Sequence, residues 1–480
     1  VGNQAGGGVR FAGVARQWDA FRAQAVRTST ADSGRTGAAV AWLERIEQAL
    51  TGPGLSATLT RFFNAAEGVA ADPTGVAPRT TFIDAAAGVA AAFTATADGL
   101  ALAEADLRAT AAMAGDELNG LLAGLAEANG GLARARAGSN EQAQLLDQRD
   151  RLIDRLSALA SVHVTTEENG AATVRINDHQ GPVLVDRGTV RPVQLALNPS
   201  GTLGITVDPF GRPETASLRG GSLAGVSDAG TRLADLRARL TDMATGFADG
   251  VNAVQAGGRD LDGQPGTPLF DAGAGDGRVA LTPIGPRQVA AARPWSVLAG
   301  GGNLGAASVS ASAAGGTTPL PATRITVGGG TLTATDPVTG AVIGTAPFTP
   351  GAPVTLAGFQ LTITGSPSAG DSYTISAVGA GSRDNGNMAT LKSLRASGGF
   401  ETGADGFVSE TASALSGKRQ IAEAQAMMLE GAIAARDERS GVNLDQEAVE
   451  LMRFQQAYQA SSRIIQVARD TFDTMLNAVG

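Results

Sequence analysis

The last forty residues of the chain repeat apolar side chains at a spacing that puts them on one face of a helix. From Leu444 the stripe advances in alternating steps of four and three, which is the 3.5-residue repeat of a coiled-coil seam. The ten stripe positions, seven of them apolar, are Leu444, Ala448, Leu451, Gln455, Tyr458, Ser462, Ile465, Arg469, Phe472 and Leu476. Proline is absent and glycine occurs only at the two ends. The sequence therefore predicts one long amphipathic helix within 442–480.

This helix needs a partner. Asn443 can cap its start, and Asp445 and Glu447 fall in the first turn, where carboxylates meet the positive end of the helix dipole. A long amphipathic helix at the end of a chain cannot bury its stripe alone. The partner can be another segment of the same chain or a neighbouring subunit, so the pattern by itself leaves domain closure and assembly both open.

Upstream, the chain alternates between helical and β-like stretches. The first 160 residues are rich in Ala and Leu, with breaks at 52–54, 72–73 and 130–131, and the period of apolar residues then falls towards two over 162–218. A helical period returns from Leu233, before a second region rich in Gly, Thr and Pro. We therefore expect a first helical core segment at 1–160, a β-insertion at 161–222, a central core helix at 223–258, a β-rich insertion at 259–380, a last helical core segment at 381–441 and an assembly helix at 442–480.

These segments predict a multidomain α+β fold. We expect one discontinuous α-helical core domain, an elongated helical bundle, with all-β domains inserted into it and a C-terminal coiled-coil helix. An alternation of strands and helices can also arise from βαβ units. Here the strands are clustered and the helices are long, which favours insertion.

Composition limits the classes of function open to this chain. Cysteine is absent, which removes disulfides and thiolate metal sites together. Its absence suits a chain that is threaded unfolded through a reducing cytoplasm, although chance loss in a proteome poor in cysteine is the alternative. A net charge of −9 argues against binding to nucleic acid. The sequence contains no run of about 18 apolar residues, the length that would predict a membrane span. No cleavable signal peptide is recognisable either.

The residues offer little for catalysis, cofactors or metal binding. The only histidines, His163 and His179, stand sixteen residues apart without a cysteine near them, and we expect ordinary surface or edge-strand positions. A G-x-G-x-x-G match at 300–305 is followed by no helix start, as a dinucleotide site would require. The segment 260–271 begins like a calcium loop but has Pro265 at the position of the required glycine. A tight turn leaving the central helix explains it better.

Five blocks resemble, in the same order, segments of the bacterial flagellar axial proteins. NLDQEAVELMRFQQAYQASSRIIQVARDTFDTMLN at 443–477 resembles their C-terminal helix, in which LxxFQQAYQASAR and a following FDxLLN are typical. The other four are GVRFAGVARQWDAFRAQAVRTSTADSG at 8–34, QLLDQRDRLIDRLSALASVHVT at 144–165, GGSLAGVSDAGTRLADLRARLTDMATGFADGVNAVQAGGRDLDGQPG at 220–266 and GSRDNGNMATLKSL at 381–394. The likeness is strongest to the hook-associated proteins that join hook to filament, and it is loose over 300–380.

The resemblance implies a structural adaptor between hook and filament, without enzymatic activity. It implies a ring of copies, conventionally eleven, with hook protein on one side and the third hook-associated protein on the other. It also implies a cytoplasmic export chaperone, passage through the flagellar type III apparatus and an extracellular position in the flagellum. The residues expected to carry assembly are Leu444, Leu451, Phe454, Gln455, Gln456, Tyr458, Ile465, Phe472 and Leu476.

The beginning of the sequence departs from this family. Flagellar axial proteins also carry an N-terminal amphipathic helix, usually with an Asn-Ile-Ala-Asn-like turn, which pairs with the C-terminal helix. This sequence begins at VGNQAGGG, without Met. We therefore expect that it enters after that helix, through truncation or processing, and that 444–476 lacks its usual partner within the chain.

Other functions stay open. Within the same family, the chain could be a third hook-associated protein or a flagellin relative, although the LLDQRD and GGSLAG blocks favour the hook–filament junction. From another class, it could be a secreted glycan-binding or hydrolytic surface protein with flagellar-type ends. Inserted domains that cleave peptidoglycan bring Cys/His or Glu/His constellations, and the β-regions of this sequence show none.

Overall fold

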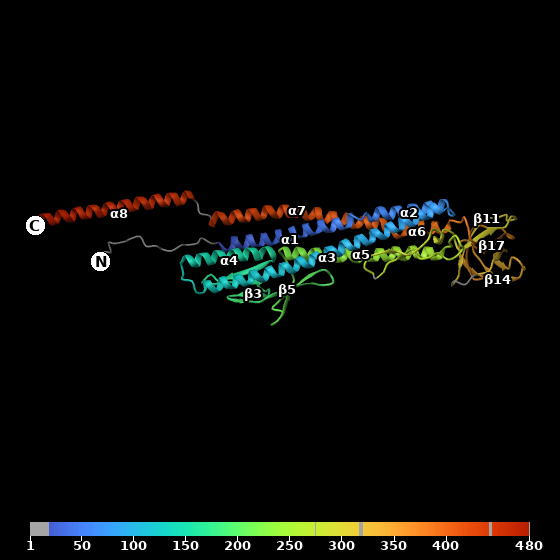
Figure 1. Cartoon of the computed structure of the whole chain (residues 1–480), viewed down its shortest axis with the longest axis horizontal. Coiled ribbons are helices and arrows are strands. Elements are labelled where there is room, and N and C mark those ends of the chain that lie inside the picture. Colours follow the sequence, from blue (N-terminus) through green and yellow to red (C-terminus); the bar gives the residue numbers. More distant parts are fainter. Residues whose placement is uncertain (1–18, 274, 316–319, 441–443, 480) are drawn as a thin grey trace.

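Helices run side by side along the long axis of the molecule, with a β-rich tip at one end and the C-terminal helix at the other (Figure 1). The computed structural model describes residues 19–273, 275–315, 320–440 and 444–479. Expectations that concern the first eighteen residues, including the missing N-terminal helix, lie outside the described residues. The described helices are α1 (Ala20–Thr51), α2 (Leu55–Ala71), α3 (Val76–Leu132), α4 (Asn140–Leu159), α5 (Ser222–Gly257), α6 (Gly386–Gly398), α7 (Phe400–Ser440) and α8 (Leu444–Val479).

The three expected helix breaks are confirmed. α1 ends at the break at 52–54, and α2 ends just before the Asp-Pro pair at 72–73. α3 ends at Leu132, directly after Gly130 and Gly131, which lie in its last turn. A Cβ on Gly131 would lie 2.9 Å from Leu145 of α4. Gly131 therefore also lets α4 pack closely against the end of α3.

The part of the bundle next to the β-rich tip has a core of its own, here called the distal core. It joins the end of α1 and the helices α2, α3, α5, α6 and α7 with the short strands β8 (Phe270–Asp271) and β9 (Ala280–Leu281). The 3-10 helix η1 (Pro286–Gln288) directly precedes Val289 of this core. Phenylalanine rings form its centre: the Phe62 ring centroid lies 4.9 Å from that of Phe82 and 5.5 Å from that of Phe247. The predicted apolar face of the central helix is thereby confirmed, since Phe247 and its neighbours along α5 are buried here.

The opposite part of the bundle shares a second core, the proximal core, with two antiparallel sheets. Their strands are β1 (Val162–Thr166), β2 (Ala172–Ile176), β3 (Val183–Asp186) and β4 (Thr189–Val190), and β5 (Val193–Leu197), β6 (Leu203–Val207) and β7 (Glu214–Ala216). Buried residues of these strands pack with α3, α4 and α5 in a single cluster. The segment expected as a β-insertion at 161–222 is therefore a layer on the helices. We call α1–α7 together with β1–β9 the helical body.

Within the described part of the chain, one β-unit has a separate core; it is formed by residues around 295–378 and is here called the β-domain. Its sheets have the orders β10-β17-β12-β13-β14 and β11-β16-β15. The strands are β10 (Trp295–Ala299), β11 (Ala306–Ala313), β12 (Thr323–Val327), β13 (Thr331–Thr335), β14 (Val342–Pro347), β15 (Pro353–Leu356), β16 (Phe359–Ser366) and β17 (Ser372–Ala377). Trp295 packs edge-on against Phe359 in this core, with ring centroids 4.9 Å apart. Long helices built from distant segments, with strands inserted between them, confirm the predicted multidomain α+β class.

α3 is the longest of the described helices and is rich in apolar residues. Among the described residues it is the one helix long and apolar enough to cross a membrane. It also runs through both cores of the helical body, where Phe82, Phe93 and Leu122 are fully buried. Packing inside the protein thus buries part of its apolar surface, whereas Leu102 and Met113 are 64% and 65% exposed.

Candidate assembly surface

The stripe predicted on the C-terminal helix faces solvent. Its four large described side chains are between 55% and 74% exposed: Leu451, Tyr458, Ile465 and Phe472. Every described side chain from 448 to 475 is exposed, including Phe454, Gln455 and Gln456. Leu444 and Leu476 belong to α8, but their side chains lie outside the described part. The sequence thus places these residues on one helix correctly, and the structure leaves their partner open.

Apolar side chains on α8 also extend beyond the predicted stripe. Further exposed members are Val449, Met452, Ile464, Val467 and Met475. Phe454 and Met475 both stand three residues after a large stripe position, so they widen the same side of the helix. A surface wider than one seam can contact more than one neighbouring helix. Sequence periodicity missed this extension because it recorded only the strongest repeat.

α7, which precedes α8, lies along α1 and is fixed to it by charged side chains. Arg419 of α7 and Glu44 of α1 form an ion pair at 2.7 Å. Towards the end of α7, the guanidinium of Arg22 donates to the carbonyl of Ala435. The helix that leads to the assembly surface is thereby anchored on the body near its own C-terminal end.

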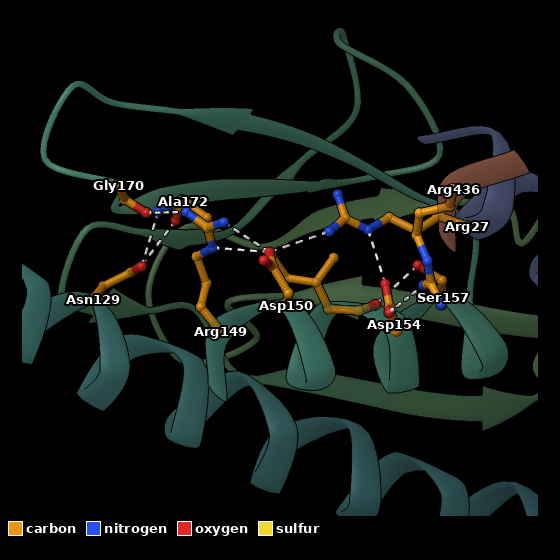
Figure 2. A network of polar contacts seen from close by, with 10 residues as sticks. Arg27, Asn129, Arg149, Asp150, Asp154, Ser157, Gly170, Ala172 and Arg436 are labelled. Atoms are coloured by element: carbon orange, nitrogen blue, oxygen red, sulfur yellow. Dashed lines mark hydrogen bonds and ion pairs between the residues drawn. The ribbon is translucent and has the colours of Figure 1, made fainter. Parts of the chain in front are cut away.

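A buried polar network lies at the same end of the body (Figure 2). The Asp150 carboxylate of α4 accepts from Arg149 Nη2 at 2.8 Å and from Arg27 Nη2 of α1 at 3.4 Å. Arg27 Nε also donates to Asp154 at 3.2 Å, and Arg436 of α7 pairs with the other oxygen of Asp154 at 3.5 Å. Two carboxylates of α4 therefore bind arginines of α1 and α7. These contacts connect the C-terminal end of α7 to the bundle.

The network continues into the β-layer. Arg149 donates to the carbonyl of Gly170 in the β1–β2 turn. The side chain of Asn129, from α3, donates to the carbonyl of Ala172 at 2.8 Å and accepts from its N–H at 2.9 Å. Arg149 and Asp150 are charged residues of α4, and charged residues of an amphipathic helix usually face solvent. The structure nevertheless buries both, because each finds an oppositely charged or carbonyl partner there.

A groove opens among α1, α5 and α7, halfway along the body. Its volume is about 590 Å³, and Ala39, Leu43 and Ala229 form a buried apolar floor. Charged side chains surround this floor. Glu410 accepts hydrogen bonds from Arg239 and, more weakly, from Arg232, and these hold the pKa of Glu410 at about 2. Both arginines therefore face a carboxylate that stays charged at neutral pH.

Comparison with known proteins relates this chain to flagellar proteins. The model of the flagellar hook-associated protein FlgK helical domain matches residues 43–270, and that of the flagellar basal body rod FlgEFG protein C-terminal region matches residues 434–478. Flagellar hook-associated protein 1 of Escherichia coli K12 is 25% identical, over 99% of this chain and 91% of the relative. Its counterpart in Salmonella typhimurium LT2 is 26% identical with the same two coverages. Relatives over nearly the full length and a family-model domain support the resemblance to flagellar hook-associated protein 1.

Among solved structures, the flagellar hook junction protein FlgK from Burkholderia pseudomallei matches this chain. That structure is 24% identical with a TM-score of 0.46, and the match covers 77% of this chain and 66% of that one. Xanthomonas campestris FlgL is 14% identical with a TM-score of 0.17, over 67% of this chain and 88% of that one. The homologues are flagellar hook-associated proteins, which implies that the chain is a component of the bacterial flagellum.

In this hook-associated protein, the GGSLAG block proves to be a packing motif. Gly221 has a φ of 78°, and a Cβ there would lie 2.3 Å from the backbone of Leu159 and Ala160. A Cβ on Gly225 would lie 2.2 Å from the carbonyl oxygen of Arg35. The start of α5 therefore lies directly against the backbones of α1 and α4, which only glycine permits.

The sequence patterns considered for binding chemistry have local structural roles. Asp260 accepts from the N–H groups of Asp262 and Gln264 at 2.9 and 2.8 Å, which makes the calcium-like segment a turn. The G-x-G-x-x-G segment leads into strand β11, as its lack of a helix start predicted. His163 and His179 do lie together, with ring centroids 6.3 Å apart, a proximity the sequence did not predict. In the described part of the chain, no group of three or more His, Asp or Glu side chains could hold a metal ion.

Proposed function

We propose that this chain is the structural adaptor that joins the flagellar hook to the filament, and that copies of it form a ring through α8. The observation that carries the proposal is the exposed apolar stripe of α8, on a segment matched by a family model of flagellar rod and hook proteins. At about 1.5 kcal/mol for each buried large side chain, the four described stripe residues would contribute on the order of 6 kcal/mol per helix.

The proposed roles along α8 follow from its repeat. Leu444, Leu451, Tyr458, Ile465, Phe472 and Leu476 form the apolar seam, and Phe454 widens it. Gln455 stands in the seam and Gln456 beside it, where amides can fix the register of packed helices. Because polar seam positions reduce stability, the assembly gains specificity in place of maximal affinity.

The proposal includes the surroundings of the ring. Its neighbours are the hook protein on one side and the third hook-associated protein on the other, and the ring has eleven copies. Before export through the flagellar type III apparatus, a cytoplasmic chaperone covers α8, whose apolar stripe would otherwise meet solvent. In the extracellular flagellum the chain works as three units, namely the helical body, the β-domain and α8, and it catalyses no reaction.

Substitutions that place charged side chains in the apolar seam of α8 test this function. Replacing Leu451, Tyr458 and Ile465 together by Asp places three carboxylates where apolar contacts are needed, each costing several kcal/mol in a buried seam. We expect filament growth and motility to be lost, while the melting temperature of the helical body is unchanged. The matched control replaces Gln459, Ala460 and Thr474 by Asp, which adds the same charge to α8 outside the stripe. Normal motility in the seam variant would refute the assembly role of α8.

A further inference from the structure

The turn between β6 and β7 exposes an aromatic side chain almost completely. Phe210 at this turn is 92% exposed, the highest value among the large apolar residues of the described chain. Two hydrogen bonds hold the turn. The N–H of Gly211 donates to the backbone carbonyl of Asp208 at 3.2 Å, and the N–H of Arg212 donates to the Asp208 carboxylate at 3.1 Å. A rigid turn that presents one aromatic ring loses little conformational freedom on binding.

The groove among α1, α5 and α7 has the properties of a site for such a ring. Its volume of about 590 Å³ lies in the range of pockets that enclose small ligands. Its floor of alanine and leucine side chains is apolar, and its charged rim is arranged by ion pairs such as Arg35–Asp228 at 2.9 Å. In addition, Nε of Arg232 is buried without an acceptor among the described residues. An incoming backbone carbonyl can accept from it.

The hairpin and the groove lie at the same level on two sides of one helix. β6 is fixed to α5 where the N–H of Leu203 donates to Ser227 Oγ at 2.9 Å, and the preceding turn touches Gly230. The next side chains of α5 in the same turns, Ala229 and Arg232, line the groove. In Figure 1 the strands around β5 lie below α3, whereas α7 follows the opposite edge of the body.

We propose that the β6–β7 hairpin of one copy seats Phe210 in the α1–α5–α7 groove of a second copy. A single chain cannot make this contact with itself, because its hairpin and its groove face away from each other. A contact between two different patches at one level repeats from copy to copy and closes into a ring when the rotation allows. This inference rests on the proposed self-assembly and names the lateral contact between bodies, in addition to α8.

The absence of cysteine allows a direct cross-linking test. Thr215→Cys, on the exposed side of the hairpin, and Ser413→Cys, at the groove, leave Phe210 and the groove floor intact. The double variant replaces the native copy in flagellated cells, and a short bismaleimide is applied to isolated hook–filament structures. We expect a ladder of cross-linked copies. Adding Phe210→Ala should slow the cross-linking about tenfold. Phe21→Ala, at a phenylalanine of α1 that is 84% exposed, should leave the rate unchanged.

The outcomes separate this contact from the function on which it rests. No ladder in structures that contain the chain by immunoblot, or an unchanged rate with Phe210→Ala, would overturn the contact and leave the junction role intact. Absence of the wild-type chain from hook–filament structures would overturn both. Cross-linking of Ser413→Cys to Ile465→Cys, but not to Thr215→Cys, would assign the groove to α8 and overturn the hairpin contact.

Discussion

Removing the carboxylate at the centre of the buried network should destabilise the helical body strongly. Asp150 is 8% exposed and lies between Arg149, 4% exposed, and Arg27, 6% exposed. Asp150→Ala leaves two buried guanidinium groups beside a methyl group. Loss of one partner from a buried ion pair costs about 3–5 kcal/mol. Because Arg27 keeps Asp154 at 3.2 Å, we expect a value near the lower end, about 3 kcal/mol.

Differential scanning calorimetry can measure this effect on the full chain. For a helical body of roughly 300 residues, about 3 kcal/mol corresponds to a fall in Tm of roughly 4–5 °C. The matched control is Glu117→Ala, which removes the exposed ion pair between Glu117 of α3 and Arg155 of α4 at 2.8 Å. An exposed pair contributes about 0–1 kcal/mol. If Asp150→Ala lowers Tm no more than Glu117→Ala does, the network does not stabilise the body and the reasoning is refuted.

Three further outcomes are expected. In urea unfolding, Gly225→Ala should lower the free energy of unfolding by about 1–3 kcal/mol, because the added methyl group overpacks against α1. Gly246→Ala on the same helix has nothing within 4 Å of its added Cβ and should raise the free energy of unfolding by about 0.5–1 kcal/mol. The lowered pKa of Glu410 means that its contribution is present above pH 4.5 and is lost as the pH falls towards 2, so the Tm difference between wild type and Glu410→Gln should shrink over that range. Equal differences at pH 6 and pH 2 would contradict this. Amide hydrogens of 451–475 should exchange rapidly in the dilute monomer while those of α5 are protected, and slow exchange in α8 would show that it packs on its own body.

Periodicity allowed most helices and strands to be predicted, because each depends on local alternation of apolar and polar side chains. The face of α5 is confirmed, since its pattern matches one secondary structure only. Periodicity does not show which elements share a core. The strands of 162–216 alternate as an independent sheet would, yet their buried faces meet helices from distant segments.

The candidate surface was only partly predictable for a related reason. The stripe of α8 is a property of one helix, and the sequence contains it completely. The buried position of Arg149 and the exposure of Phe210 depend on neighbours brought by folding. The pairing of the two histidines requires Asn177, with a φ of 61°, to turn the chain back beside β1, where its N–H donates to the carbonyl of Ser161 at 2.7 Å. A single sequence gives no direct signal for such contacts.

The β-domain is connected to the body through its two outermost residues on neighbouring strands. Trp295 of β10 faces Ala377 of β17 in antiparallel register, and the N–H of Val378 donates to the carbonyl of Pro294 at 3.1 Å. Cα atoms paired in this way are about 5 Å apart, so the chain leaves the body and re-enters it at nearly one point. The β-domain could therefore be lengthened, exchanged or deleted by a change at this one point of the chain. The packing of the helices in the body would stay the same, because their contacts are made elsewhere.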